Sequence, residues 1–408
     1  MPIYTNQAPG LFIEELKGHR TIQPVPTSVA AFVGQAPNDK AHLNEVFFVN
    51  NLQQFRAEFA AGDNVKSTWL SHAVFGFFQN RGGRCAIVNL PDSEPLAGSD
   101  KSPRSGLKLL EENDEVSIVA APGRFDPSSH EALISHCESM GNRFAILDLA
   151  DIKNTELLKT VEAVAVPSKG KDKDAAAGDA GAKASAAGGA RPRVSPYAAT
   201  YFPWIAVPDA LSPTGVLVLT PPSGHIAGVY ARTDLERGVH KAPANTSVGA
   251  VNLSYRVTSA EQAGLNQAGI NCIRWFTPEG STVWGCRTLA ELGSEWTYVN
   301  VRRLLIFIEE SIKRNMRWAV FEPNDRTLWK SVRSEISRFL TILYRDGALM
   351  GATPEEAFFV KCDEETNLPE LIDLGQLTTV IGVAPVKPAE FIVFKIGQTL
   401  GGAQVEAL

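Results

Sequence analysis

Residues 116–149 decide the class of fold, and they read VSIVAAPGRFDPSSHEALISHCESMGNRFAILDL. A short apolar run at 116–121 is followed by an amphipathic stretch at 130–140 and by a second apolar run at 144–149. Apolar runs of this length are typical of strands buried on both faces, and the stretch between them has helical spacing. The pattern predicts a strand–helix–strand unit, which places both strands parallel in one sheet.

The same alternation continues toward the N-terminus. Residues 29–34 (VAAFVG) and 85–90 (CAIVNL) predict two further buried strands, and residues 52–61 predict a helix between them. The region before residue 150 therefore predicts an α/β fold with a mostly parallel sheet.

Further strands are expected later in the chain, at residues 201–207 and 216–220. The chain then passes through Pro221, Pro222, Gly224 and Gly228. Proline and glycine both interrupt regular structure, so this stretch predicts irregular, turn-rich chain.

Residues 167–193 differ in composition from the rest of the chain. They read PSKGKDKDAAAGDAGAKASAAGGARPR and contain no Val, Ile, Leu or aromatic residue. Such a segment cannot bury enough apolar surface to offset the entropy lost on ordering. We expect it to form a mobile surface loop.

The last third of the chain has a different pattern. Residues 301–316 and 325–346 have long helical periodicity, and strand-like runs follow at 358–362, 377–385 and 391–396. Successive helices followed by strands predict an α+β domain that is distinct from the α/β region.

The helix predicted at residues 325–346 has two contrasting faces. Its apolar stripe consists of Leu328, Val332, Ile336, Phe339, Leu340 and Leu343. The opposite face is basic and consists of Arg326, Lys330, Arg333, Arg338 and Arg345. Asn324 or Asp325 is placed to cap the first turn, and Gly347 is placed to end the helix. The basic face is either simply solvated or a contact surface for an acidic partner.

Composition excludes several classes of protein. The 408 residues are 44% hydrophobic and 21% charged, which is typical of a soluble protein with two or three domains. A net charge of −6 lacks the basic excess that nucleic-acid binding requires. Five scattered cysteines without a C-x-x-C pair predict neither a disulfide framework nor a zinc site. No signal peptide and no apolar run of about 18 residues is found, so we expect neither secretion nor a membrane span.

Catalytic motifs are absent from the sequence. HEALISH, which begins at His130, superficially resembles a zinc-protease helix, but His136 lies six residues on, where the metal-binding pair needs a spacing of four. The chain has no G-x-G-x-x-G, no phosphate-binding loop and no G-x-S-x-G. We therefore predict no catalytic, cofactor-binding or metal-binding residue, although catalytic groups can also assemble from distant parts of a sequence.

Several stretches resemble the contractile tail sheath protein family. They are APGLFIEEL (8–16), VPTSVAAFVG (25–34), PPSGHIAGVYARTD (221–234), GVHKAPAN (238–245), LNQAGINCIRWF (265–276), VWGCRTL (283–289), EWTYVNVRRLLIFIEESI (295–312), VFEPNDRTLW (320–329) and APVKPAEFIVFKIGQ (384–398). The resemblance covers both ends and most of the chain after residue 195, and it is weakest between 91 and 195. The loop at 167–193 departs from the family pattern, as does Cys286, where alanine is common.

The resemblance implies a fold that is both α/β and α+β. An inner α+β domain is built from both chain ends, an α/β domain with a mostly parallel sheet is inserted into it, and strand arms lie at the termini. We accordingly expect an N-terminal arm at 1–20, an outer α/β domain at 21–285, an inner C-terminal domain at 286–388 and a C-terminal arm at 389–408.

The resemblance also implies a function without a cofactor. Subunits would assemble as stacked six-fold rings around an inner tube, and the sheath would contract to drive that tube through a target membrane. The implied partners are further copies of the chain, the inner tube protein, and baseplate and tail terminator or cap proteins. Assembly would occur in the bacterial cytoplasm, as part of a phage tail or tail-like particle, without nucleic acid and without direct membrane insertion.

Two groups of residues carry the expected contacts between subunits and with the tube. Apolar strand-like residues near both termini either fold back on their own sheet or add to the exposed edge of a neighbour. The resemblance favours donation to neighbouring subunits, by Leu11, Phe12, Ile13, Phe391, Ile392, Val393 and Phe394. The resemblance also implies that a helix of the inner domain lies against the tube, and we expect four residues of the basic helix to make that contact, namely Arg326, Lys330, Arg333 and Arg338.

Two other classes of function stay open from the sequence. One is an α/β hydrolase-like enzyme with a non-contiguous active site, and the other is a capsid or adhesin-type protein that assembles but does not contract. The sequence also leaves open whether the particle is a phage tail or a phage-derived injection system.

Overall fold

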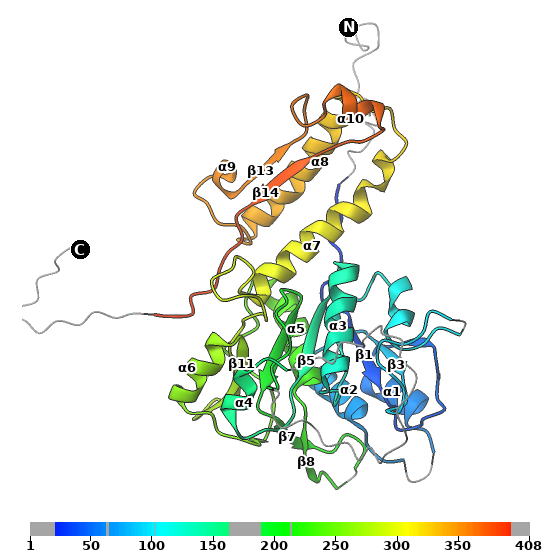
Figure 1. Ribbon diagram of the computed structural model, residues 1–408, viewed down its shortest axis with the longest axis vertical. Coiled ribbons are helices and arrows are strands. Elements are labelled where there is room, and N and C mark those ends of the chain that lie inside the picture. Colours follow the sequence, from blue (N-terminus) through cyan, green and yellow to red (C-terminus); the bar gives the residue numbers. More distant parts are fainter. Residues whose placement is uncertain (1–20, 63–64, 102, 163–188, 213, 393–408) are drawn as a thin grey trace, which may run out of the picture. The chain divides into compact units, whose positions relative to one another are not determined.

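The computed structural model describes residues 21–62, 65–101, 103–162, 189–212 and 214–392 (Figure 1). The chain divides into two compact units. The large unit contains Val25–Glu310 and takes up the chain again at Pro385, whereas the small unit contains Ser311–Ala384 and the chain up to Pro24. Each unit therefore combines segments that are distant in sequence. The boundaries predicted at 285/286 and 388/389 stay predictions.

The large unit is built on a nine-stranded mixed sheet. Six neighbouring strands, from β3 to β11, run parallel, and the strands outside them are antiparallel to their neighbours. The order across the sheet is β2 (Val46–Val49), β3 (Cys85–Asn89), β1 (Ala30–Gly34), β4 (Ile118–Ala120), β5 (Phe144–Asp148), β6 (Ala198–Phe202), β11 (Ile270–Phe276), β12 (Gly280–Trp284) and β9 (Thr246–Ser247). The expectation of a mostly parallel sheet is confirmed.

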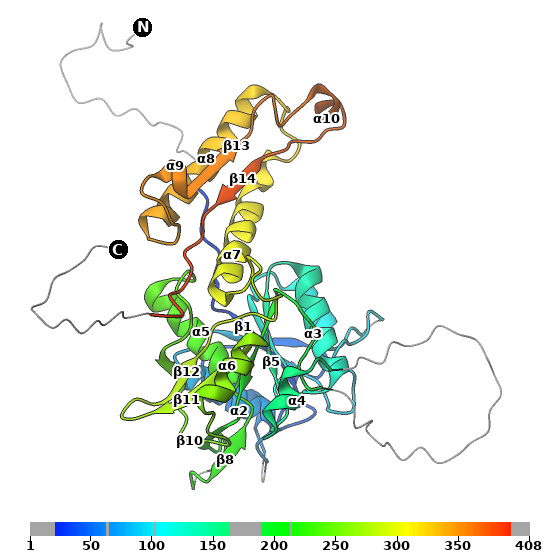
Figure 2. The ribbon, with the colours of Figure 1, turned by 60° about the vertical axis from the view of Figure 1, so that its left-hand side comes forward.

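Helices cover both faces of this sheet. α2 (Trp69–Gln79) and α5 (Ser223–Arg237) pack on one face, and α3 (Pro127–Met140) packs on the other (Figure 2). Because successive side chains of a strand point to opposite faces, Phe32 joins the first core and Val33 the second. The other helical segments of the large unit are α1 (Leu52–Phe59), η1 (Gly106–Glu112), α4 (Thr155–Lys159), α6 (Ser259–Gln267) and the first part of α7 (Val299–Asn315).

The expectation of irregular chain after Pro222 is wrong, because the helix α5 occupies this stretch. Its glycines permit close packing against α2. A Cβ atom on Gly224 would lie 2.2 Å from Ala73 Cα, and one on Gly228 would lie 2.6 Å from the Phe77 carbonyl oxygen. The two glycines are four residues apart and therefore share one helix face. Burial against α2 thus outweighs the low helix propensity of glycine.

The prediction of a single strand at residues 201–207 is also wrong. The chain forms β6, ends it at the cis peptide bond between Phe202 and Pro203, and then begins β7 (Ile205–Pro208) in a different sheet. That second sheet has the order β10 (Asn252–Leu253), β7 and β8 (Leu217–Thr220), and its pairs are antiparallel. Proline has no amide hydrogen and cannot continue the ladder, which is why one apolar run serves two sheets.

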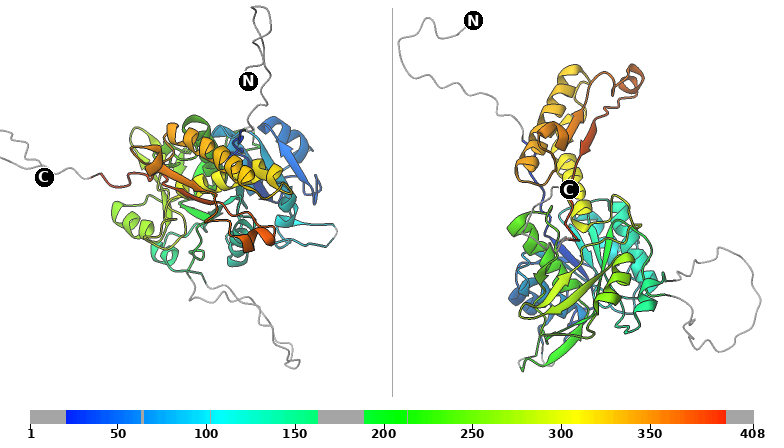
Figure 3. Two further views of the ribbon diagram at one scale, coloured as in Figure 1. Left: turned by 90° about the horizontal axis from the view of Figure 1, so that it is seen from above. Right: turned by 90° about the vertical axis from the view of Figure 1, so that its left-hand side faces the viewer.

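The small unit combines a long helix with a two-stranded sheet. α8 (Arg326–Arg345) packs on β13 (Phe358–Lys361), which pairs antiparallel with β14 (Val380–Val383) (Figure 3). Its other helical segments are η2 (Met316–Ala319), α9 (Pro354–Ala357) and α10 (Pro369–Asp373). The predicted α+β character of the last third is confirmed.

The helix α8 closely follows its sequence pattern. All six residues of the predicted apolar stripe are buried, together with Trp329. The Asp325 side chain accepts a hydrogen bond from the Leu328 amide and so caps the first turn. Gly347 lies just beyond the helix with φ +75°, a conformation that favours glycine. Both ends of this helix were therefore predictable.

Candidate assembly surfaces

The C-terminal segment of the large unit is fixed by one carboxylate. Glu390 accepts hydrogen bonds from Arg287 Nη2 at 2.6 Å, Arg287 Nε at 3.0 Å, Asn266 Nδ2 at 2.7 Å and the Tyr298 hydroxyl at 3.2 Å. Burial acts to raise the pKa of Glu390, but the hydrogen bonds and positive charge of Arg287 outweigh it, so the pKa lies below its usual value. We call these four residues the Glu390 clamp. Asn300 adds a second fixed point, because its amide donates to the Val386 carbonyl at 3.1 Å.

Apolar side chains follow directly after the clamp. Phe391 and Ile392 are 74% and 73% exposed, and neither lies in a strand. Their apolar surface is therefore not covered by the described part of the chain. The other residues predicted to exchange strands lie outside the described residues, namely Leu11, Phe12, Ile13, Val393 and Phe394.

The small unit offers open strand edges. β13 and β14 pair with each other from Phe358↔Val383 to Lys361↔Val380. Among the described residues neither strand has a second partner, so each presents a row of unpaired backbone groups. Phe359 on β13 and Val380 on β14 are also exposed. A two-stranded sheet of this kind can accept added strands on both sides.

The basic face of α8 is largely exposed. Arg326, Lys330 and Arg333 are exposed, whereas Arg338 is half-buried. Arg326 forms an ion pair with Glu364, with 2.6 Å between Nη2 and Oε1. Three of the four predicted tube-contact residues thus lie at i, i+4 and i+7 on one exposed helix face.

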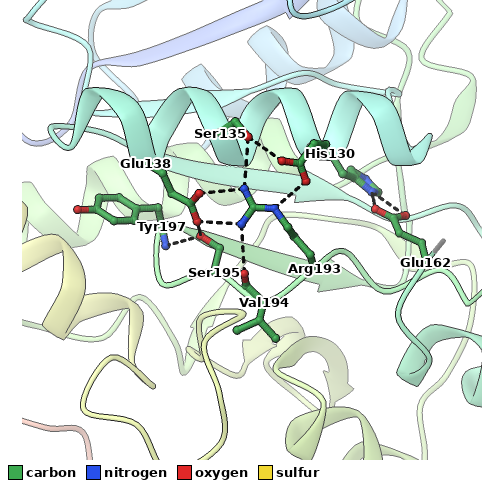
Figure 4. Close-up of polar contacts among 9 residues, drawn as sticks. His130, Ser135, Glu138, Glu162, Arg193, Val194, Ser195 and Tyr197 are labelled. Carbon is green, nitrogen blue, oxygen red and sulfur yellow. Dashed lines mark hydrogen bonds and ion pairs between the residues drawn. The ribbon is translucent and has the colours of Figure 1, made fainter. Parts of the chain in front are cut away.

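Part of the predicted loop at residues 167–193 is ordered. Arg193 donates to Glu131 at 2.6 Å and to Glu138 at 2.9 Å. Both carboxylates belong to α3 and are seven residues apart, so they share one face of the helix. Figure 4 shows Glu138 beside Arg193. The Ser195 hydroxyl also donates to Glu138, at 2.6 Å. Composition alone indicated disorder because it takes no account of ion pairs between distant segments. Residues 189–193 are irregular chain, as predicted, but they are partly buried and held by specific contacts instead of forming a mobile surface segment. Residues 167–188 lie outside the described residues.

The two ends of the segment between residues 162 and 189 are joined. The Glu162 amide donates to the Arg191 carbonyl at 2.8 Å, and the Arg191 amide donates to the Thr160 carbonyl at 3.0 Å. The buried Glu162 carboxylate pairs with His130 Nδ1 at 3.0 Å (Figure 4). We call this arrangement the stem junction.

The two histidines of α3 have separate partners. His130 contacts Glu162 and, at 2.8 Å, the Asp148 carbonyl oxygen, whereas His136 lies 3.2 Å from Arg143. Burial, followed by the charge of Arg143, lowers the pKa of His136 to about 3. Within the described ranges, no cluster of three or more His, Cys, Asp or Glu side chains is arranged to hold a metal ion.

Comparisons with known proteins give the family. Residues 105–289 match the model of the phage tail sheath protein central domain, and residues 291–399 match that of the phage tail sheath C-terminal domain. A chain of the solved PVC sheath complex, an extracellular contractile injection system in its contracted state, is 30% identical to this chain. The match covers 97% of this chain and 98% of that one, with a TM-score of 0.75. The chain belongs to the contractile tail sheath family.

Other known proteins are similar over different lengths. A chain of the six-fold symmetrised baseplate of the anti-feeding prophage is 30% identical to this one. The match covers 97% of this sheath chain and 99% of the baseplate chain, with a TM-score of 0.71. The tail sheath protein of Vibrio phage KVP40 is 31% identical over 176 residues. That match covers 42% of this chain and 25% of the phage protein, so the chain matches about a quarter of that relative's length.

The sequence reasoning missed the clamp of this sheath protein, although its signal was present. Arg287 lies in the family-like stretch VWGCRTL, and Glu390 lies in APVKPAEFIVFKIGQ. The two residues are 103 positions apart, so neither spacing nor periodicity links them. A charged residue in each of two resembling stretches was the available signal.

Proposed function

We propose that this chain is the structural subunit of a contractile sheath. It assembles as stacked six-fold rings around an inner tube, and the sheath contracts to drive the tube through a target membrane. Family membership and the likeness to a contracted sheath support this proposal. The observation that carries it is a clamped C-terminal segment whose next two apolar residues are uncovered, in a chain that also has an open two-stranded sheet.

Strand exchange links the subunits in this proposal. The terminal residues Leu11, Phe12, Ile13, Phe391, Ile392, Val393 and Phe394 add strands to β13 and β14 of neighbouring copies. Each backbone hydrogen bond gained is worth about 1 kcal/mol, and each added strand supplies several. Such links hold rings together while the packed cores stay unchanged, because only the dihedral angles of the connecting chain have to change.

The basic face of α8 contacts the tube in this proposal. Positive charge toward an acidic tube surface comes from Arg326, Lys330, Arg333 and Arg338. The ion pair with Glu364 partly neutralises Arg326, so Arg326 contributes less to this attraction than the others. Each exposed ion pair is worth at most about 1 kcal/mol. Repetition over many subunits makes the sum large, whereas each weak contact can release during contraction.

The domain arrangement and partners follow from the same proposal. The small unit serves as the inner domain and the large unit as the outer one; this is supported by the fact that the small unit combines Ser311–Ala384 with the chain before Val25. The partners are further copies, the inner tube, the baseplate and a terminator or cap, and assembly takes place in the bacterial cytoplasm. The named relatives are sheath proteins, which favours a structural role over catalysis. No helix in the described ranges is long and apolar enough to cross a bilayer.

Truncation tests this function directly. We would express the full chain, a chain ending at Glu390 and a chain lacking residues 1–16, and examine each by negative-stain electron microscopy. The full chain should form hollow, ridged tubes with six-fold end views, whereas both truncations should stay folded and form none. A chain lacking residues 167–188 is the matched control and should still assemble. Tubes from either truncated chain would contradict strand exchange, and discrete particles from the full chain would contradict the sheath.

A further inference from the structure

The turn between η2 and α8 exposes two apolar side chains of the small unit. Val320 is 61% exposed and Phe321 is fully exposed, so the described part of the chain leaves both largely uncovered. An aromatic side chain stabilises a fold mainly through the apolar surface that it buries. Phe321 buries almost none, so the described fold gains little from a phenylalanine at this position.

The backbone at Phe321 is also strained. The Glu322 amide donates to the Ala319 carbonyl at 3.4 Å, with Val320 at φ −70° and ψ 131° and Phe321 at φ +68°. These values define a type II turn, whose third residue is usually glycine or asparagine because it must adopt a positive φ. A bulky side chain is unfavourable in that conformation. Strain at an exposed aromatic residue points to a function outside the fold of the single subunit.

The chain that follows the turn is firmly held. The Asn324 side-chain oxygen accepts from Trp329 Nε1 at 2.7 Å, and its amide nitrogen donates to the Gln376 carbonyl at 2.8 Å. The turn therefore presents Phe321 at a defined position, and little conformational entropy is lost when a partner covers it. Aromatic side chains presented in this way are typical anchors of protein interfaces. We call residues 319–322 the Phe321 turn.

A second surface of the small unit combines apolar and acidic side chains. Leu368 and Leu374 flank α10 and are 51% and 71% exposed. Glu370 and Asp373 lie between them in the sequence, are exposed, and form no ion pair within the described ranges. We call these four residues the α10 patch. It offers apolar surface with negative charge beside it.

The surroundings of the Phe321 turn are mostly basic. The exposed basic residues nearest in sequence are Lys313, Arg317 and Arg326, and the exposed acidic ones are Glu322 and Asp325, which caps α8. Within one subunit Arg326 already pairs with Glu364, a few residues before the α10 patch. Opposite charge therefore favours the approach of a Phe321 turn to an α10 patch.

We propose that the Phe321 turn of one subunit packs on the α10 patch of a second copy of the chain. Phe321 is fully exposed, so it does not reach the patch of its own subunit. The inference rests on the self-assembly proposed above and adds a contact to it. Each subunit uses its turn toward one neighbour and its patch toward the other, which is the head-to-tail arrangement that closes rings. The contact leaves Lys330 and Arg333 to the tube.

This contact is weak by itself. One phenylalanine and two leucines cover far less than the roughly 1,600 Å² that a stable pair of proteins buries. The contact therefore acts together with strand exchange, since repetition around a ring adds many weak contacts.

Disulfide crosslinking of the full chain tests the contact. All five cysteines of the chain are buried, so an introduced surface cysteine reacts selectively. Val320→Cys and Leu368→Cys keep Phe321 and Leu374 in place. After mild oxidation with diamide, a mixture of the two variants should give a covalent dimer, and neither variant alone should give one. A chain with both cysteines should give a ladder of oligomers. Leu235→Cys is the matched control, because Leu235 is 82% exposed in the large unit, and its mixture with Val320→Cys should give no dimer.

A second variant separates the anchor from the fold. Phe321→Asn, placed in the Val320→Cys chain, should lower the yield of mixed dimer by about fivefold or more. Asparagine tolerates the left-handed conformation, so the urea midpoint of this variant should stay the same or rise. Glu370→Lys combined with Asp373→Lys should also lower the yield.

Negative-stain microscopy of the same samples separates this inference from the proposed function. Tubes without the mixed dimer would overturn the contact and leave the sheath standing, whereas a mixed dimer without tubes would support the contact and contradict the sheath. An unchanged dimer yield in Phe321→Asn would overturn the anchor. A dimer as the largest product of the chain with both cysteines would indicate a two-fold pair and overturn the head-to-tail arrangement. Protection of Val320→Cys from maleimide by added tube protein, without a mixed dimer, would assign the turn to the tube instead.

Discussion

The replacement Glu390→Ala should release the C-terminal segment without unfolding the protein. The substitution removes the carboxylate that accepts hydrogen bonds from Arg287, Asn266 and Tyr298. The cores on both faces of the nine-stranded sheet do not include these residues. Asn300 still holds the Val386 carbonyl, so the segment beyond Val386 should detach locally while the sheet keeps its packing.

The size of the effect follows from the geometry of the clamp. Hydrogen bonds that involve a charged group contribute about 1.5–3 kcal/mol, and neutral ones contribute about 1 kcal/mol. The Arg287 and Glu390 side chains keep 11% and 17% exposure, so solvent screening reduces these values. A total near 3 kcal/mol is reasonable for the clamp, and it corresponds to about a hundredfold change in the ratio of anchored to released segments.

Sedimentation velocity measures the consequence, because sheaths and free subunits separate widely. At equal concentration, Glu390→Ala should leave most of the protein as free subunits, and Glu390→Gln should show a smaller loss. The charge exchange that combines Arg287→Glu with Glu390→Arg is the matched control, and it should recover part of the assembly. Thermal unfolding of the free subunit should change little.

Acid should act like the substitution. The folded-state pKa of Glu390 is depressed below 4.5, so the clamp contributes fully above that pH and is lost as the pH falls through the lower, folded value. The reasoning is refuted if Glu390→Ala assembles as fully as the unmodified chain. It is equally refuted if the variant fails to fold, since the clamp would then be part of a core.

Four further predictions concern other parts of the molecule. Changing Lys330 and Arg333 to Glu should leave a folded subunit that no longer co-sediments with the tube protein, and high salt should act in the same direction; undiminished co-sedimentation would mean that this face is merely solvated. Replacing residues 167–188 by a short Gly/Ser linker should preserve folding and assembly, because loop-closure cost changes slowly with length, and a loss of either would contradict this. Gly224→Ala should destabilise the subunit by about 1–3 kcal/mol in urea unfolding, since its Cβ would overlap α2, and an unchanged midpoint would exclude that contact. Burial lowers the pKa of His225 to about 3 from an ordinary 6.5, so as the pH drops below 6.5 the unfolded chain takes up a proton that the folded chain does not. The free energy of unfolding should therefore decrease below pH 6.5, and it should depend less on pH in a His225→Leu variant.

Much of the fold could be predicted because strands and long helices carry local patterns. The apolar run at residues 144–149 and the stripe of α8 each identify their own element without reference to the rest of the chain. Gly224 and Gly228 could not be interpreted in this way. Their small size is an advantage only against α2, about 150 positions earlier in the chain, and a local rule counts them as breakers.

The assembly surfaces were predictable to a smaller extent. Helical spacing placed Arg326, Lys330 and Arg333 on one face, and the structure keeps them exposed. The partner of Arg326 lies on another segment, at Glu364, and so does the partner of Arg287. Ion pairs between distant segments depend on the completed fold, so the periodicity of the sequence cannot predict them.

The stem junction has a consequence for what the subunit can carry. The Glu162 amide donates to the Arg191 carbonyl, so the two chain ends that flank the intervening segment are already held together by the rest of the fold. A foreign domain whose own two ends lie near each other could be grafted at this place without stretching the host. In a helical particle each copy would bear one such passenger at regular spacing. In the assembly proposed above, this junction would be one insertion point in every subunit.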